Sequence, residues 1–250
     1  MTLLVTGATG YLGRQLLRLA PAARGVSTAD FDVRDAAAVR AAVRGCTAVV
    51  HTAYRQGPPD AWPVNVEGSR AVAEAAAAVG ARLIHVSTDV VFSGSRGWYT
   101  EADEPDPATD YGASKAAAEA AVRESCPEAL IVRTSLLYGG PGAEPSKHEL
   151  AALDPTSVWF TDERRCPIQV ADLAAALLEL VASDVCGVLH VAGGDAVSRC
   201  ELARLFARRE VRCTTTVEAG VVRPLDCTLC SARARSLLQT RLRGCREVLA

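Results

Sequence analysis

The chain has 250 residues, of which 49% are hydrophobic and 22% are charged, and its formal net charge is −2. This length and balance are typical of a globular protein with one large domain or with one domain and a smaller appendage. The small net charge gives no electrostatic basis for binding nucleic acid or an anionic membrane, and no apolar run approaches the roughly 20 residues that span a bilayer. Because MTLLVTGATG leads directly into a strand and a glycine turn, we expect a cytoplasmic protein without a signal peptide.

The nine cysteines are scattered along the chain, which favours reduced thiols that pack as small hydrophobic side chains in a reducing compartment. Cys227 and Cys230 alone have the spacing of metal ligands, and no second close pair or nearby histidine completes a tetrahedral site. The four histidines are dispersed. The sequence therefore predicts no metal site.

Short apolar runs alternate with helical patterns along the first half of the chain, as in a parallel sheet covered by helices. The expected strands are Thr2–Thr6, Val26–Ala29, Ala48–Thr52, Leu83–Ser87, Leu130–Arg133 and Val188–Val191. The expected helices are Tyr11–Leu19, Ala36–Val43, Pro63–Val79, Tyr111–Glu124 and Val170–Val181. Two of the strand runs, AVVHTA and LIHVST, are continuously apolar, which is typical of strands buried on both faces. The fold class is therefore α/β with a doubly wound parallel sheet.

A glycine-rich turn, Gly7-Ala-Thr-Gly10-Tyr-Leu-Gly13, follows the first strand and opens the first helix. Gly7 permits the tight turn, Gly10 lets a pyrophosphate approach the backbone, and Gly13 lets helix and strand pack closely. The helix N-terminus adds N–H groups and a positive dipole for the phosphates. In this context the motif predicts a dinucleotide site. Its expected members are Gly7, Thr9, Gly10, Tyr11, Leu12, Gly13 and Arg14.

The choice between NAD and NADP stays open from the sequence. Asp30 follows the second strand, where a carboxylate accepts the ribose hydroxyls of NAD and repels a 2′-phosphate. Arg14, just after the glycine motif, could instead pair with that phosphate. We expect Asp32 and Val33 to border the adenine.

The stretch DYGASK places Tyr111 and Lys115 four residues apart, so that they share one helix face at about 5–6 Å. A nearby ammonium lowers the pKa of a phenol from its usual value near 10, so that the phenol can exchange a proton with a carbonyl or hydroxyl. Thr88 ends an apolar strand, and its hydroxyl could bind the oxygen that Tyr111 protonates. Alone, the stretch Ser87-Thr88-Asp89 is more often a turn or a helix cap, and DYGASK could be only the first turn of an alanine-rich surface helix. Together with the glycine turn, they predict a catalytic set.

In order along the chain, TGATGYLG, STDVVFSG, YGASK, RTSLLYG and VADLA resemble the extended short-chain dehydrogenase/reductases, and within them the dTDP-4-dehydrorhamnose reductase branch. The likeness covers nearly the whole chain and ends in RPLDCTLCSARARSLL. It implies a Rossmann-type fold and an NAD(P)-dependent oxidoreductase of carbohydrate biosynthesis, which reduces the 4-keto group of a nucleotide-linked deoxysugar. By this resemblance Thr88, Tyr111 and Lys115 are the catalytic set, with Tyr111 as general acid. Tyr111 and Lys115 are also expected to bind the cofactor, where Lys115 can reach the nicotinamide ribose.

The resemblance also assigns residues around the cofactor and the substrate. Those after the third strand, near the cofactor, are Thr52, Ala53 and Tyr54; those near the substrate are Thr88, Asp89, Val90, Leu136 and Arg165. Val90 and Leu136 stand where the family usually has a tyrosine and a tryptophan that line the sugar pocket, so large flat contact surfaces are missing. Arg165 stands where related enzymes contact a nucleotide diphosphate, although a surface arginine is the alternative.

We assign residues 1–136, to which 168–192 return, to an NAD(P)-binding Rossmann domain, and 137–167 and 193–250 to a smaller C-terminal substrate-binding part. The expected partners are a small-molecule substrate, a nucleotide sugar, and a second copy of the chain in a homodimer that pairs helices Pro63–Val79 and Tyr111–Glu124. Three alternatives stay open: an NAD-dependent sugar-nucleotide epimerase, a reductase of a non-sugar biosynthetic intermediate, and a non-catalytic cofactor-binding regulatory subunit.

Overall fold

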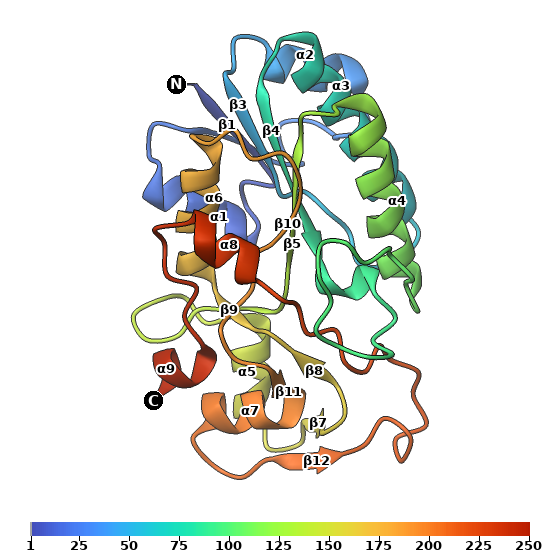
Figure 1. The fold of residues 1–250 in the computed structure, drawn as a ribbon, viewed down its shortest axis with the longest axis vertical. Coiled ribbons are helices and arrows are strands. Elements are labelled where there is room, and N and C mark those ends of the chain that lie inside the picture. Colours follow the sequence, from blue (N-terminus) through green and yellow to red (C-terminus); the bar gives the residue numbers. More distant parts are fainter. Residues whose placement is uncertain (1) are drawn as a thin grey trace. The chain divides into compact units, whose positions relative to one another are not determined.

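The structure, a computed structural model, describes residues 2–250 (Figure 1). Its largest element is a six-stranded sheet with the order β10-β5-β4-β3-β1-β2. The strands are β1 (Leu3–Thr6), β2 (Arg24–Val26), β3 (Ala48–His51), β4 (Arg82–Thr88), β5 (Leu130–Thr134) and β10 (Gly187–His190). β1 pairs in parallel with both β2 and β3, and β3 pairs in parallel with β4. Because the chain reverses its direction of winding between β1 and β3, the sheet is doubly wound, and the predicted α/β fold class is confirmed.

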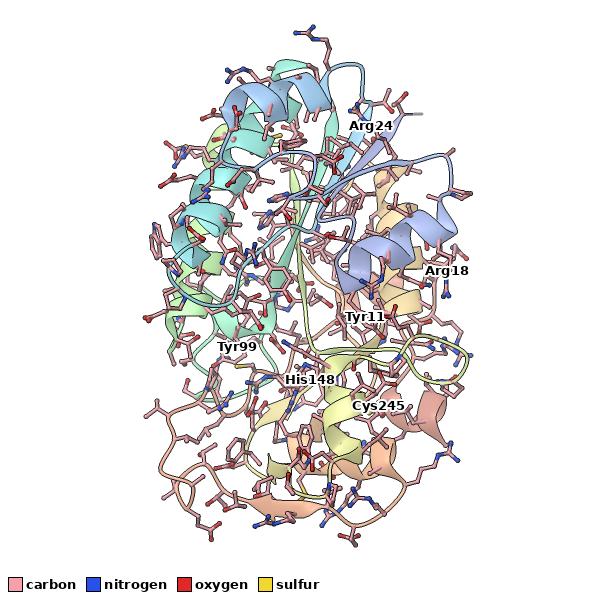
Figure 2. All side chains as sticks on the ribbon, turned by 180° about the vertical axis from the view of Figure 1, so that it is seen from behind. Tyr11, Arg18, Arg24, Tyr99, His148 and Cys245 are labelled. Atoms are coloured by element: carbon pink, nitrogen blue, oxygen red, sulfur yellow. A yellow bond between two sulfur atoms is a disulfide. The ribbon has the colours of Figure 1, made fainter. Side chains whose placement is uncertain are left out.

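Helices cover both faces of this sheet. On one face lie α2 (Ala36–Val43), α3 (Gly68–Ala78) and α4 (Asp110–Ser125), which share a buried core of alanine, valine and leucine side chains with the strands. On the other face lie α1 (Tyr11–Leu19) and α6 (Val170–Val181), side by side in both views; Tyr11 marks the start of α1 in Figure 2. The sheet is therefore buried on both faces, as its apolar strand runs predict.

Most of the expected elements agree with the observed bounds to within one residue at each end, with two larger differences. The expected helix Pro63–Val79 is a π-helical turn, η1 (Pro63–Glu67), followed by α3. The expected strand Val26–Ala29 ends at Val26, because the chain turns immediately afterwards. In this turn the carboxylate of Asp30 accepts a hydrogen bond from the backbone N–H of Ser27 at 2.8 Å.

The chain divides into two compact units. Unit 1 comprises Met1–Thr88, Asp110–Arg133 and Ala174–Leu189, and holds nearly all of the large sheet. Unit 2 comprises Asp89–Thr109, Thr134–Leu173 and His190–Ala250. The assignment of cofactor binding to 1–136 and of substrate binding to 137–167 and 193–250 stays a prediction.

Unit 2 is built from two-stranded pairs and short helices. Its elements are η2 (Asp89–Val91), β6 (Leu137–Tyr138), α5 (Lys147–Leu153), β7 (Val158–Phe160), β8 (Arg164–Arg165), β9 (Ile168–Gln169), β11 (Val197–Ser198), α7 (Arg199–Ala207), β12 (Arg212–Thr214), α8 (Ala232–Leu237) and α9 (Cys245–Leu249). The strand pairs are β6 with β9, β7 with β12 and β8 with β11. Capping boxes at Ser146 and Ser198 start α5 and α7, since each serine and the glutamate three residues later exchange hydrogen bonds.

The expectation that all nine cysteines are reduced thiols is wrong for one pair. Cys200 on α7 and Cys213 on β12 form a disulfide, with their Cα atoms 5.9 Å apart. These cysteines become neighbours because α7 packs on β7, the strand that pairs with β12, and this arrangement has no local sequence signal. The other seven cysteines are free, and most of these are buried, as expected for small apolar side chains.

Residues 2–250 contain no cluster of three or more histidine, cysteine, aspartate or glutamate side chains arranged to hold a metal ion. No helix among them has the length and apolarity needed to cross a membrane.

Candidate cofactor and active site

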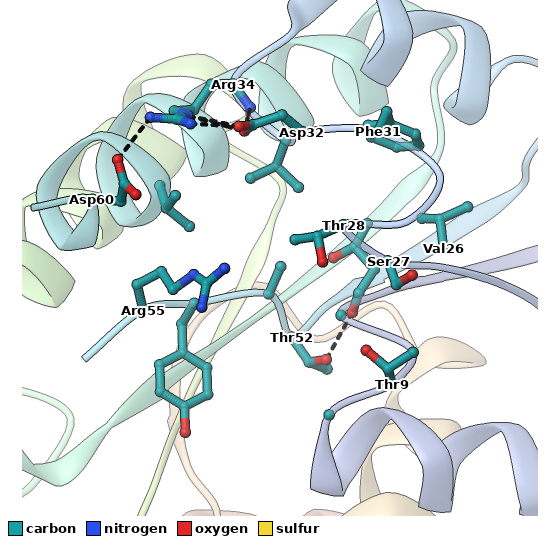
Figure 3. Close-up of a pocket in the computed structure, with 17 residues that line it drawn as sticks. Thr9, Val26, Ser27, Thr28, Phe31, Asp32, Arg34, Thr52, Arg55 and Asp60 are labelled. Atoms are coloured by element: carbon teal, nitrogen blue, oxygen red, sulfur yellow. Dashed lines mark hydrogen bonds and ion pairs between the residues drawn. The ribbon is translucent and has the colours of Figure 1, made fainter. Parts of the chain in front are cut away.

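A cavity of about 320 Å³ lies in unit 1 where β1, β2 and β3 end (Figure 3). Open parallel sheets bind ligands at this edge, at the point where the winding direction reverses. Of the residues that the sequence assigns to the cofactor, eight line the cavity: Gly7, Thr9, Gly10, Asp32, Val33, Thr52, Ala53 and Tyr54. The predicted dinucleotide site therefore coincides with a cavity that three separate strand ends build.

The glycine turn has the shape that a dinucleotide pyrophosphate requires. Gly7 has a φ of +71°, and a Cβ there would lie 2.8 Å from the backbone nitrogen of Ala53. A Cβ on Gly13 would collide with the carbonyl oxygen of Gly7, so α1 packs tightly against the turn. Gly10 precedes α1 and has no side chain to cover the helix N-terminus. These residues fit a bound dinucleotide phosphate, and Gly7, Thr9 and Gly10 would hold it.

Six expected cofactor residues do not line the cavity: Tyr11, Leu12, Gly13, Arg14, Tyr111 and Lys115. Leu12 and Gly13 are buried. The guanidinium of Arg14 donates a hydrogen bond to the carbonyl oxygen of Thr9 at 2.6 Å. Asp30, the candidate acceptor for NAD ribose hydroxyls, also lies outside the lining, because its carboxylate is bound to Ser27 in the turn after β2.

The cavity is lined by polar and charged residues that the sequence did not indicate: Ser27, Thr28, Arg34, Arg55 and Asp60. Arg34 lies between two carboxylates, with its Nε 2.9 Å from Asp32 and its NH1 3.1 Å from Asp60 (Figure 3). The hydrogen bond from Arg34 lowers the pKa of Asp32. Among residues 2–250 no ion pair or side-chain hydrogen bond joins the guanidinium of Arg55. The charge of Arg55 nevertheless contributes to lowering the pKa of Asp32, after the hydrogen bonds from Arg34, and the two arginines and two aspartates of the lining balance in formal charge.

The start of α4 is linked to this cavity through aromatic and hydrogen-bond contacts. The ring of Tyr111 lies 6.0 Å, centroid to centroid, from the ring of Tyr54, which lines the cavity. Asn65 is fully buried and binds both the N–H and the carbonyl of Arg55, at 2.8 and 2.9 Å. Its amide also donates to the hydroxyl of Ser114, which donates to the carbonyl of Tyr111. One buried side chain therefore fixes the loop after β3 against the first turn of α4.

Lys115 follows Tyr111 by one helical turn and is buried against β4. Its Nζ donates to the carbonyl of Val86 at 2.9 Å and lies 3.3 Å from Nε2 of His85. Burial lowers the pKa of Lys115 to about 8, although the carboxylate of Glu119 opposes this shift. Thr88 ends the same strand, two residues after Val86. The helix period and β4 thus bring Tyr111, Lys115 and the strand that carries Thr88 together in unit 1.

The other expected substrate residues lie in unit 2. The carboxylate of Asp89 is buried, accepts a hydrogen bond from the Ser135 hydroxyl and lies 3.6 Å from Nε of Arg165. Arg165 is not at the surface: it is 3% exposed and donates to the carbonyls of Pro224 and Leu225, at 2.9 and 2.8 Å. Burial alone would lower the pKa of Arg165, but neighbouring carboxylates, Asp89 first, raise it.

Val90 and Leu136, at the two positions where the family usually has pocket aromatics, are both partly buried. Leu136 packs against a core cluster formed by Tyr138, Val197, Leu202 and Cys245. A role for either residue in binding substrate stays a prediction.

The RmlD substrate binding domain family matches residues 1–247. The chain belongs to this family. It is 39% identical over 224 residues to dTDP-4-dehydrorhamnose reductase of Mycobacterium tuberculosis (strain CDC 1551 / Oshkosh), which covers 81% of this chain and 73% of that protein. It is 36% identical over 247 residues to the enzyme of the same name from Streptomyces griseus, which covers 88% of this chain and 81% of that protein.

Solved structures agree with this RmlD family membership. The crystal structure of dTDP-4-dehydrorhamnose reductase from Bacillus anthracis str. Ames, in complex with NADP, has a TM-score of 0.88 and 30% sequence identity. The alignment covers 100% of this chain and 98% of that one. The resemblance read from the sequence motifs is therefore confirmed.

Proposed function

We propose that this RmlD family protein is an NAD(P)H-dependent reductase of the 4-keto group of a nucleotide-linked deoxysugar. The observation that carries the proposal is the placement of Tyr111 and Lys115 on one turn of α4, with the Tyr111 ring 6.0 Å from the cavity residue Tyr54. Relatives named dTDP-4-dehydrorhamnose reductase, and the NADP complex of one of them, support both the reaction and the cofactor.

In the proposed reaction the bound reduced nicotinamide supplies a hydride to the carbonyl carbon. Tyr111 donates its phenolic proton to the carbonyl oxygen, so that the carbonyl becomes a hydroxyl and Tyr111 becomes a phenolate. The ammonium of Lys115 stabilises that phenolate by its charge. Thr88 donates a hydrogen bond to the same substrate oxygen and orients it. Tyr111 then recovers a proton from solvent.

The identity of the sugar depends on unit 2 in this proposal. Val90 and Leu136 replace aromatic side chains that the family usually presents to the sugar, and their smaller surfaces favour a differently shaped substrate. We also propose that 137–167 and 193–250 form most of the substrate-binding part. Asp89 and Arg165 belong to this substrate-binding part as a buried ion pair. Most of their hydrogen-bonding groups already have partners within unit 2.

A homodimer is part of the proposal, formed by the helices around α3 and α4. Ala113, Ala116 and Ala117 on α4 are partly exposed, and small side chains of this kind let helices approach closely. Arg70 of α3 and Glu124 of α4 form an ion pair between exposed side chains, so the two helices are neighbours at the surface that would form the dimer interface. Light scattering on the purified protein should give twice the mass of the 250-residue chain, and the chain mass itself would contradict the dimer.

The deciding experiment measures NADPH and NADH oxidation against a panel of dTDP-, UDP- and GDP-linked 4-keto sugars, with Tyr111→Phe as the control. We expect turnover with at least one of these sugars, and loss of at least a thousandfold of kcat in Tyr111→Phe with cofactor binding unchanged. Net epimerisation without cofactor consumption would favour an epimerase. Cofactor binding without turnover on any sugar would favour a non-sugar substrate or a regulatory subunit.

A further inference from the structure

The ammonium group of Lys115 is held by strand β4 and not by its own helix. Lys115 is 2% exposed, and its Nζ reaches the carbonyl oxygen of Val86 at 2.9 Å and Nε2 of His85 at 3.3 Å. An ammonium group offers only N–H donors, so Nε2 of His85 is the acceptor in this contact. The ring hydrogen of His85 is then on Nδ1.

His85 is a buried ring with a fixed neighbour. It is 0% exposed and lies directly opposite His51 of β3, with the ring centroids 5.3 Å apart. His51 is anchored at both nitrogens, through Nδ1 to the Thr6 hydroxyl at 2.6 Å and through Nε2 to the Ser69 hydroxyl at 3.0 Å. The His85 ring therefore lies beside a neighbour whose own orientation is fixed.

Burial and, after it, the surrounding charges keep both rings neutral. Burial, followed by the nearby ammonium of Lys115, lowers the pKa of His51 to about 3 and that of His85 well below 6.5. A neutral His85 keeps the lone pair on Nε2 that the ammonium needs, whereas a protonated ring would repel it. The charged groups beyond the histidines are Glu119 on α4, one turn after Lys115, and Arg133 on β5, which pairs with Glu119.

We propose that His85 is a positioning residue, which fixes and stabilises the ammonium form of Lys115 by accepting its hydrogen bond. This inference rests on the proposed function only for its kinetic consequence, because the contact itself exists without substrate or cofactor. His85 acts through Lys115, which in turn serves Tyr111. Removing the acceptor leaves the buried ammonium less stabilised, so Lys115 loses its proton at a lower pH.

The composition of the chain makes the pKa of Lys115 measurable at a single side chain. Lys115 and Lys147 are its only lysines, so protein labelled with ε-13C lysine gives two side-chain signals, and Lys115→Arg assigns them. His85→Phe keeps a planar ring without the acceptor, whereas His85→Gln offers a carbonyl oxygen near the position of Nε2. We expect the pKa of Lys115 to fall by about one unit in His85→Phe and to recover in His85→Gln, with Lys147 unchanged.

An unchanged Lys115 titration in folded His85→Phe protein would overturn the proposal. If that variant does not fold, 15N spectra of the wild-type histidines show which ring nitrogen of His85 carries the hydrogen. A His85 ring protonated on Nδ1, whose Nε2 shift follows the titration of Lys115, supports the proposal, and a ring protonated on Nε2 overturns it. Because neither spectrum needs turnover, failure of the reductase function would be seen separately.

In an active enzyme, the kcat profiles of the same variants show whether His85 positions Lys115 or only supports the fold. We expect His85→Phe to lower kcat about twofold at pH 7 and by up to about tenfold above pH 8, because the alkaline limb of the kcat profile moves to lower pH. The KM for the sugar should stay unchanged, and His85→Gln should restore the profile. A uniform loss of activity at every pH, with the limb in place, would contradict the positioning role.

Discussion

Glu119 and Arg133 form an ion pair that is almost completely excluded from water. Their side chains are 0% and 1% exposed, and NH2 of Arg133 lies 2.8 Å from Oε2 of Glu119. Nε of Arg133 reaches both carboxylate oxygens, and the Ser87 hydroxyl donates to Oε1. This pair connects α4 to β5 and, through Ser87, to the end of β4. It therefore supports the two elements that carry Lys115 and Thr88.

Removing one partner of this pair should destabilise the protein severely. We expect Glu119→Leu or Arg133→Met to lower the free energy of unfolding by about 3–5 kcal/mol, because each leaves an unpaired charge or donor buried. The double variant should lose less than either single variant. Urea unfolding of the three proteins measures this, and additive losses would show that the two side chains are not coupled.

Cofactor preference should depend on Arg55 and not on Arg14. Arg55 lines the cavity and, among residues 2–250, forms no ion pair or side-chain hydrogen bond, so its N–H groups can bind the additional 2′-phosphate of NADPH, whereas the Arg14 guanidinium binds the Thr9 carbonyl. We expect Arg55→Ala to raise the Kd for NADPH about tenfold or more and to change that for NADH much less. Calorimetric titration of Arg55→Ala and Arg14→Ala compares the two positions. A larger effect at Arg14 would reverse this assignment.

Arg165 should behave first as a structural residue. Its guanidinium is buried on the carbonyls of Pro224 and Leu225 and lies beside Asp89. We expect Arg165→Met to lower the melting temperature by at least 5 °C, since several charge-assisted hydrogen bonds are lost and Asp89 stays buried. Thermal unfolding followed by circular dichroism measures this. A variant with an unchanged melting temperature and a raised KM for the sugar would instead support a direct diphosphate contact.

Mild acid should destabilise the protein through its buried histidines. The pKa of His51 is about 3 in the folded protein because of burial, against about 6.5 unfolded, so between these values the unfolded chain binds more protons. Stability is then complete above pH 6.5 and declines as the pH falls toward 3. From pH 7.5 to 5.5 the loss is about 1.4 kcal/mol for this histidine.

His85 also makes the protein less stable as the pH falls, because its pKa is lowered by burial as well. Urea unfolding of wild type and His51→Gln at pH 7.5 and 5.5 measures how much of the loss in unfolding free energy comes from His51. The variant should lose less stability than the wild type over this interval. Equal losses would mean that folding does not lower the pKa of His51.

Local patterns in the sequence determined the elements and the chemistry that a short stretch can carry. The glycines at 7, 10 and 13 predict the turn between β1 and α1, because the need for glycine at each position depends only on residues nearby in the chain. The four-residue spacing of Tyr111 and Lys115 predicts a shared helix face for the same reason. Continuous apolar runs predicted β3 and β4 as buried strands, and the alternation of elements predicted the doubly wound sheet.

Only the tertiary structure decided which groups meet. Asp30 is used in its own turn, so the carboxylate expected near the ribose lies outside the cavity, and Arg55 enters it from the loop after β3. Cys213 meets Cys200, and Lys115 meets His85, 30 residues earlier in the chain. Such contacts depend on how distant segments pack, and hydrophobic periodicity records which face of a segment is buried but not which partner covers it.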